Sequence, residues 1–178
     1  MAIQSMHPKS WRNNLAWLLL AFFFLYEYFL SNFVGTIAPQ VMHDLVLHEA
    51  SFAQIAAVYL IAYAIMQTPV GLLADRYSLR LLAGSACFAC AMGAGLFAFS
   101  TTFWQALLAR LLMGIGASFA YICVLKGSLN WFGEASFSFY VGLANMVGSM
   151  GPALAAAPLI FVLIQLDASW RHLLLAIS

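Results

Sequence analysis

The charged side chains inside long apolar stretches are the residues best placed to do chemistry in this sequence. Glu27 lies in the middle of the apolar run 15–37, and Arg110 lies inside the run 103–125. An ionisable group at the centre of a membrane helix costs about 2.5–3.5 kcal/mol on insertion scales, so it usually faces a bundle interior or water and marks a pathway. We therefore predict that Glu27 and Arg110 couple protons or contact a substrate. The alternative for Glu27 is a hydrogen-bonded structural carboxyl.

The depths of Glu27 and Arg110 in their runs can be compared at about 1.5 Å of helix rise per residue. Glu27 then lies about 18 Å from the start of its run, and Arg110 about 10 Å from the opposite membrane surface. In a hydrocarbon core about 30 Å thick these depths agree within one helical turn. Our hypothesis is that the two side chains share a polar layer and influence each other's protonation. The alternative is that Arg110 extends alone to the nearer membrane surface.

The composition shows which solvent must surround the elements that carry these residues. Hydrophobic residues make up 65% of the 178 residues and charged residues only 7%, whereas soluble domains carry about 25% charged residues. Such a chain cannot cover itself with a water-compatible surface, so we expect lipid around it. The net charge of +1 and the scattered basic residues argue against a nucleic-acid partner.

Apolar runs of membrane-spanning length divide the chain after a short tail, residues 1–14. The complete runs are 15–37, 52–73, 81–99, 103–125 and 137–166, and a sixth begins at 170 and is truncated at 178. The runs lack the alternation of barrel strands, and open sheet edges do not occur in lipid. We therefore predict an all-α membrane protein with five complete helices and the start of a sixth. Capping-box spacing at Ser51–Gln54 and Thr102–Gln105 marks two helix starts.

Basic residues in the tail and loops predict the orientation of this bundle. Five basic residues lie in the tail and in the loops on the same side of the membrane as the tail, namely Lys9, Arg12, Arg76, Arg80 and Lys126. One basic residue, Arg171, lies in the loops on the opposite side. Cytoplasmic loops carry the excess of Lys and Arg, so the N-terminus is predicted to be cytoplasmic. No small-residue cleavage site follows the first apolar run, so we interpret it as an uncleaved helix.

Other residue groups that suggest chemistry fit common motifs poorly. Cys87 and Cys90 have redox-motif spacing, but they lie inside an apolar run without a second pair, so we interpret them as packing residues. His43, His48 and Glu49 match no common zinc spacing. No phosphate-cradling glycine loop is present. We predict no catalytic residue, metal or cofactor, and therefore not an enzyme.

The loop between the second and third runs carries a longer motif. Its residues run Gly71-Leu72-Leu73-Ala74-Asp75-Arg76-Tyr77-Ser78-Leu79-Arg80. This segment resembles the signature loop of the major facilitator superfamily (MFS), in which a glycine and a basic residue usually occupy the positions of Ser78 and Leu79.

Three shorter motifs follow in the order and on the runs that the same family shows. They are Arg110, Gly114 and Gly116 on the fourth run, Gly148, Gly151 and Pro152 on the fifth, and Trp170-Arg171 at the start of the sixth. The resemblance covers the chain from Leu15 onward.

The resemblance implies twelve helices in two halves that rock around a midplane solute site, of which this chain supplies the N-terminal half. It implies a bacterial inner membrane, a conformational latch at Asp75 with Gly71, Arg76 and Arg80, and helix packing or a hinge at the glycines and Pro152. Glu27 matches a frequent proton-coupling acid. The implied partners are a small-molecule solute, a proton, membrane lipid, and a C-terminal half or second copy.

We accordingly predict secondary active, proton-coupled transport by alternating access, with symport or antiport left open. The alternative is a truncated or non-transporting half of this fold that serves as a remnant, scaffold or sensor.

Overall fold

The computed structural model describes residues 11–165 and 169–178. This part of the chain contains eight helices and no strand, which confirms the predicted all-α class. The helices are α1 (Trp11–Thr36), α2 (Ala38–Asp44), α3 (Glu49–Arg76), α4 (Leu79–Ala98), α5 (Phe103–Phe132), α6 (Glu134–Ala155), α7 (Ala157–Gln165) and α8 (Trp170–Ile177).

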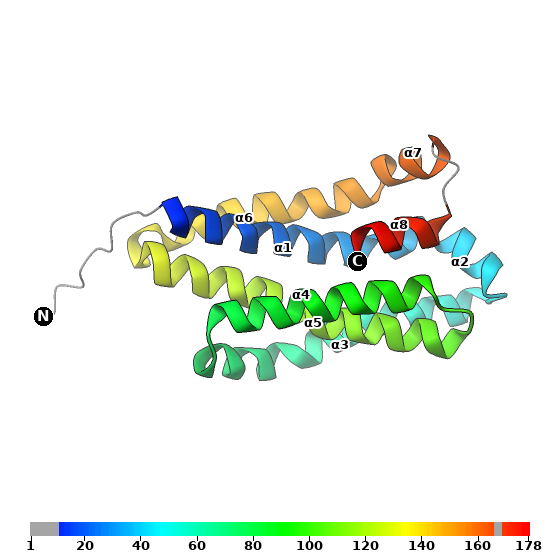
Figure 1. Ribbon diagram of the computed structural model, residues 1–178, viewed down its shortest axis with the longest axis horizontal. Coiled ribbons are helices and arrows are strands. Elements are labelled where there is room, and N and C mark those ends of the chain that lie inside the picture. Colours follow the sequence, from blue (N-terminus) through cyan, green and yellow to red (C-terminus); the bar gives the residue numbers. More distant parts are fainter. Residues whose placement is uncertain (1–10, 166–168) are drawn as a thin grey trace, which may run out of the picture.

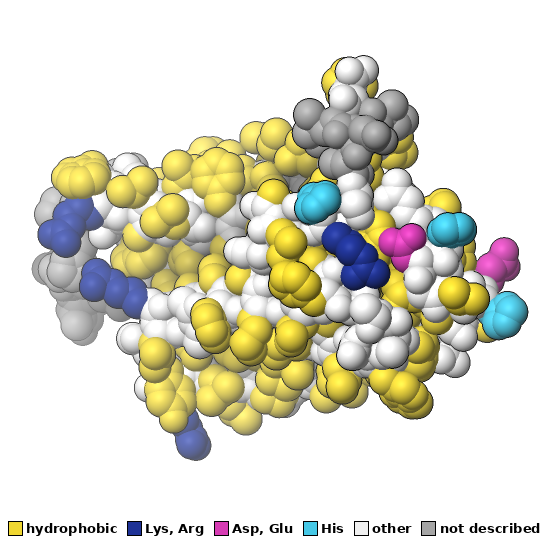
Figure 2. All heavy atoms as spheres, turned by 45° about the vertical axis from the view of Figure 1, so that its right-hand side comes forward, with side chains coloured by type: hydrophobic (Ala, Val, Ile, Leu, Met, Phe, Trp, Pro, Cys, Tyr) yellow, Lys and Arg dark blue, Asp and Glu magenta, His cyan; other side chains and the backbone are white. Residues whose placement is uncertain are grey.

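The long helices lie side by side along the longest axis of the molecule (Figure 1). The start of α1 and the α3–α4 and α5–α6 turns lie at one end, and α2, α8 and the α4–α5 turn lie at the other. Four helices, α1, α3, α4 and α5, are long and apolar enough to cross a membrane. Hydrophobic side chains cover most of the flank between the two ends in Figure 2, and charged side chains gather at the ends. This distribution suits a bundle whose flank lies in lipid.

Of the two helix starts predicted from capping-box spacing, the structure contradicts one and confirms the other. The predicted start at Ser51 is wrong, because α3 begins at Glu49 with His48 as N-cap and no side-chain cap bond. Glu49 in the first turn places a negative charge near the positive end of the helix dipole, which favours the earlier start. The start after Thr102 is confirmed, since its hydroxyl accepts a hydrogen bond from the Gln105 backbone N–H at 3.4 Å.

The fourth predicted run continues as helix beyond its expected end. α5 extends to Phe132 and ends at Gly133, whose φ of 72° reverses the chain direction into α6. Lys126, expected in a loop, therefore lies on α5. Glycine populates this positive φ at no steric cost.

The fifth predicted span is divided into two helices. α6 passes through Pro152 and ends at Ala155, and α7 begins at Ala157 with Pro158 in its first turn. Pro158 has no backbone N–H and therefore leaves a helix carbonyl without its partner. Next to the break, the Thr36 hydroxyl of α1 donates a hydrogen bond to the Ala155 carbonyl. A side chain from a neighbouring helix thus satisfies a carbonyl at the interruption.

Small residues allow the helices to approach one another closely. A Cβ at Gly114 of α5 would collide with the Tyr59 carbonyl of α3, and one at Gly116 would lie 2.8 Å from the Ala86 carbonyl of α4. On α6, a Cβ at Gly151 would lie 2.5 Å from the Leu25 carbonyl of α1. Such positions permit the close backbone contact by which helices associate in lipid.

Candidate functional site

Glu27 lies inside the bundle on α1. Its side chain is 5% exposed, and within the described residues its Oε2 atom has no hydrogen-bond partner. Tyr28 on α1 and Tyr59 and Tyr63 on α3 interact electrostatically with the carboxyl group. The carboxyl group is therefore buried, and within the described residues no basic side chain forms an ion pair with it. Its free oxygen can accept a proton or bind a cation.

Arg110 lies on α5 and is fully buried, at 0% exposure. Its Nη1 donates a hydrogen bond of 2.7 Å to the Leu30 carbonyl of α1. The guanidinium carbon lies 4.4 Å from the ring centroid of Tyr59 and 5.6 Å from that of Phe33. Nε and Nη2 have no hydrogen-bond partner among the described residues. Arg110 thus lies inside the bundle and points toward α1.

Tyr59 connects the Glu27 and Arg110 positions. Its hydroxyl donates a hydrogen bond of 3.1 Å to the backbone carbonyl of Glu27, and its ring faces the Arg110 guanidinium. Leu30, which accepts the Arg110 bond, is three residues from Glu27 on α1. Glu27 and the Leu30 carbonyl that binds Arg110 therefore lie within one helical turn of each other on α1, and residues 11–165 and 169–178 contain no ion pair between the Glu27 and Arg110 side chains.

Two exposed carboxamides belong to the polar surface of the spans and were missed by the sequence reasoning. The Asn32 side chain on α1 donates a hydrogen bond to the Tyr28 carbonyl at 2.8 Å, and the Asn145 side chain on α6 donates to the Val141 carbonyl at 2.9 Å. Polar groups in a span avoid lipid, so these side chains mark a face toward water or protein. The available signal was the presence of a carboxamide inside each apolar run.

The loop motif lies at the α3–α4 end of the bundle. Asp75 is highly exposed, with 83% of its side chain accessible, and its Oδ1 atom lies 3.6 Å from Nζ of Lys126 on α5. Arg76 and Arg80 are exposed at the same turn, and Gly71 lies in the last two turns of α3. The motif is therefore separate from the buried Glu27 layer.

Two of the predicted hinge residues, Gly148 and Gly151, lie on the face of α6 that packs against α1. A Cβ at Gly148 would lie 2.8 Å from the Phe24 ring, and Pro152 follows Gly151 inside a helix that continues for three more residues. The interruption of this span thus lies at Ala156, four residues beyond Pro152.

The cysteines and histidines form no metal site in the described part of the chain. Groups of three or more His, Cys, Asp or Glu side chains able to hold an ion are absent there. Cys87 is exposed, whereas Cys90 and Cys123 are buried, and all three are free thiols. The Cys90 thiol donates to the Met113 carbonyl at 3.7 Å, which is a packing contact between α4 and α5.

The apolar antiparallel helices and their buried polar layer define a multi-pass α-helical membrane protein. The family model of the Major Facilitator Superfamily matches residues 17–178, and the chain belongs to this family.

Curated relatives are similar over nearly the whole chain. The Probable L-galactonate transporter of Escherichia coli (strain K12) is 27% identical over 163 residues, covering 92% of this chain and 36% of that protein. The Hexuronate transporter of the same strain is 30% identical over 163 residues, covering 89% and 37%. The Membrane sensor protein UhpC of Salmonella typhimurium is 24% identical over 166 residues, covering 92% and 36%.

The chain thus spans little more than a third of the length of these relatives. The family and the transporters among the relatives support solute transport at the level of the family, and they point to a transporter rather than an enzyme.

Proposed function

We propose that this chain is the N-terminal part of a secondary active transporter that moves a small solute by alternating access with a proton as coupling ion. The observation that carries the proposal is the buried Glu27 carboxyl, which has an oxygen without a hydrogen-bond partner in the described structure. Its neighbour Arg110 is a second buried charge, and two of its nitrogens, Nε and Nη2, have no hydrogen-bond partner among the described residues. Ionisable groups at such depth mark proton relays and solute pathways in membrane proteins.

Protonation of Glu27 would change the net charge of this layer from neutral to positive. A layer that holds Arg110 alone is more costly to keep from water than one that also holds a carboxylate. Protonated Glu27 therefore favours a conformation in which water reaches Arg110, whereas ionised Glu27 favours one in which the layer stays closed. The side chains around Tyr59 are arranged differently in the two conformations. This difference is what allows a proton to shift the balance between inward-open and outward-open states.

Other parts of the chain take supporting roles in this proposal. Asp75, Arg76 and Arg80 latch the cytoplasmic end in one conformation, and Asp75 exchanges Lys126 for a group of the second half. Pro152 and the glycines of α6 let that helix move against α1. The remaining solute cavity comes from a C-terminal half or a second copy. The protein lies in the bacterial inner membrane, surrounded by lipid, with its N-terminus in the cytoplasm.

The proposed solute is a sugar acid. Two relatives are named for L-galactonate and hexuronate, which are sugars that carry a carboxylate. Arg110 either contacts that carboxylate when the layer opens or adjusts the protonation of Glu27. Asn32 and Asn145 lie on α1 and α6 with exposed carboxamides suited to hydroxyl groups of a sugar.

The test is uptake of labelled hexuronate into cells or proteoliposomes that contain the protein under an imposed pH gradient. Uptake that requires the gradient and is abolished by Glu27→Gln supports the proposal. Glu134→Gln makes the same chemical change at an exposed position on the first turn of α6 and is expected to leave uptake unchanged. Gradient-driven uptake by Glu27→Gln at the wild-type rate would refute the coupling role.

The second candidate function is sensing without transport. It is favoured by the similarity to a relative named as a membrane sensor protein. A sensor binds the solute with the same face but releases it on the side from which it came. Saturable hexuronate binding without accumulation under any gradient would support this candidate over transport.

A further inference from the structure

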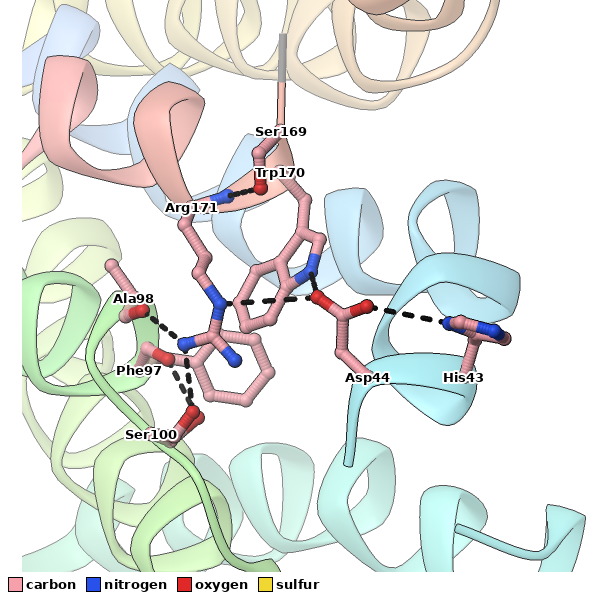
Figure 3. A network of polar contacts seen from close by, with 8 residues as sticks. All are labelled: His43, Asp44, Phe97, Ala98, Ser100, Ser169, Trp170 and Arg171. Carbon is pink, nitrogen blue, oxygen red and sulfur yellow. Dashed lines mark hydrogen bonds and ion pairs between the residues drawn. The ribbon is translucent and has the colours of Figure 1, made fainter. Parts of the chain in front are cut away.

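A network of polar contacts joins three helix ends at the end of the bundle opposite the loop motif (Figure 3). We call it the Asp44 cluster: Asp44 at the end of α2, Trp170 and Arg171 in the first turn of α8, and the carbonyls of Ala98, the last residue of α4, and of Ser100, two residues further on. Neither the proton-coupling proposal nor the loop latch uses any of these residues. The contacts join segments more than 70 residues apart in the sequence.

Asp44 contacts both residues that begin α8. Its Oδ2 atom accepts a hydrogen bond of 2.9 Å from the indole Nε1 of Trp170 and lies 3.9 Å from Nε of Arg171. Its other oxygen, Oδ1, lies 3.5 Å from Nδ1 of the exposed His43. One oxygen of the carboxylate therefore contacts α8, and the other contacts a residue of its own helix, α2.

Arg171 extends the network to α4. Its Nη1 donates hydrogen bonds of 2.6 Å to the Ala98 carbonyl and 2.7 Å to the Ser100 carbonyl. The last carbonyls of a helix lack intrahelical partners, and a cation there is stabilised by the helix dipole. Arg171 also lies over the Trp170 ring, with the guanidinium carbon 4.5 Å from the ring centroid.

Trp170 fills the space beneath this polar surface. Its side chain is 1% exposed, and its ring lies 5.6 Å from that of Phe97, near the end of α4. The indole N–H of a buried tryptophan needs an acceptor, and Asp44 supplies it. If Asp44 were removed, Trp170 would retain a buried donor and Arg171 would lose its acidic neighbour.

We propose that Asp44 is a positioning residue that fastens the first turn of α8 to the ends of α2 and α4, so that these three ends move as one unit. All groups of the cluster come from this chain, so the unit forms without contacts from a second half. When the protein changes conformation at this end, the ends of α2, α4 and α8 then keep their positions relative to one another and move together relative to the rest of the protein.

The Asp44 cluster is distinct from the proton-coupling layer. The hydrogen bond from Trp170 contributes most to lowering the pKa of the Asp44 carboxyl, and His43 and Arg171 add smaller effects in the same direction. Asp44 therefore remains ionised in mild acid, and the fastening stays closed under conditions in which a coupling carboxyl has to gain and lose a proton.

The test is amide hydrogen exchange of the chain in lipid nanodiscs, followed by mass spectrometry on peptides from each helix. Asp44→Ala is expected to raise exchange in α8 and in the α4–α5 turn by about ten-fold or more, the change expected for loss of a hydrogen bond to a charged group. Peptides from the middle of α3 and α5 are expected to keep wild-type exchange. Trp170→Phe retains most of the ring contact with Phe97 and is expected to give a smaller increase in α8.

The matched controls separate positioning from general loss of structure. His43→Ala removes the exposed neighbour of the other Asp44 oxygen and is expected to leave α8 unchanged. Asp44→Ala combined with Trp170→Phe is expected to raise α8 exchange no further than Asp44→Ala alone, because it also removes the buried indole N–H that Asp44→Ala leaves without an acceptor. Unchanged α8 exchange, equal increases in α3 and α5, or additive effects in the double variant would each overturn the proposal. If Asp44→Ala fails to fold, an effect of Trp170→Phe equal to that of His43→Ala overturns it as well.

Discussion

Replacing Arg110 with methionine tests whether this residue serves stability or function. Arg110→Met removes the hydrogen bond to Leu30, worth about 1.5–3 kcal/mol for a charged donor. It also removes the cation–π contact with Tyr59, worth about 0.5–2 kcal/mol. The side chain is fully buried, so methionine fills similar space without leaving a large cavity.

The same substitution removes costs that the native residue carries. Nε and Nη2 are buried without partners in the described part of the chain, and each such donor costs about 1–3 kcal/mol. Losses and gains are therefore of the same size, and we expect the free energy of unfolding to change by no more than about 1 kcal/mol. For a chain of this size that corresponds to about 2–4 °C in Tm.

The assay combines thermal unfolding in detergent with solute uptake. The expected outcome is a Tm close to that of the wild type together with at least about a ten-fold loss of uptake, equal to about 1.4 kcal/mol. A decrease of more than about 3 kcal/mol in stability, with uptake lowered only in proportion to the folded protein, would refute the reasoning. Arg110 would then be a structural residue whose contacts outweigh its desolvation.

Three further substitutions test packing, charge and backbone strain. Gly114→Ala places a Cβ against the Tyr59 carbonyl and is expected to lower the free energy of unfolding by about 1–3 kcal/mol. Gly142→Ala is the control, because a Cβ there meets no neighbouring atom within 4 Å, and it is expected to leave stability unchanged. Equal Tm values for the two variants would contradict this prediction. The lowered pKa of Asp44 stabilises the fold above its ordinary value of 3.8, and that stabilisation is lost as pH falls through the lowered pKa. Asp44→Asn should flatten this acid dependence in a pH series of Tm values; an unchanged series contradicts it. Val46 has a φ of 52°, which is unfavourable for a β-branched residue. Val46→Asn is therefore expected to raise the free energy of unfolding by about 1 kcal/mol, and a lower Tm would contradict the claim that the backbone is strained at this position.

The spans of this fold were predictable because apolar length is a strong signal. The starts and ends were less predictable, because local chemistry decides them. Thr102 caps its helix with a side chain as expected, whereas the start at Glu49 needs no side-chain cap and left no comparable pattern. The end of α5 depends on the positive φ of Gly133 rather than on Lys126.

The break at Ala156 could not be predicted from its own segment. Pro152 and Pro158 both offered a place to interrupt the span, and the helix passes through the first and breaks before the second. The Thr36 hydroxyl, which satisfies the carbonyl of Ala155, comes from α1. Only the tertiary arrangement shows which interruption has a partner.

The candidate site was predicted by charge and depth, but its geometry was not. Counting residues placed Glu27 and Arg110 within one turn of each other. The structure adds that Tyr59 lies between the two positions and that the guanidinium bonds to a backbone carbonyl. Aromatic residues are common throughout the spans, so the sequence offers no way to single out Tyr59.

The most direct test of the account measures proton movement and solute exchange in the same preparation. Addition of hexuronate to weakly buffered cells should make the medium alkaline if the proton enters with the solute, or acidic if it leaves in exchange. Glu27→Gln should abolish this pH change while labelled internal hexuronate still exchanges with unlabelled external hexuronate. A pH change of wild-type size in Glu27→Gln would contradict the central claim that this carboxyl carries the coupled proton.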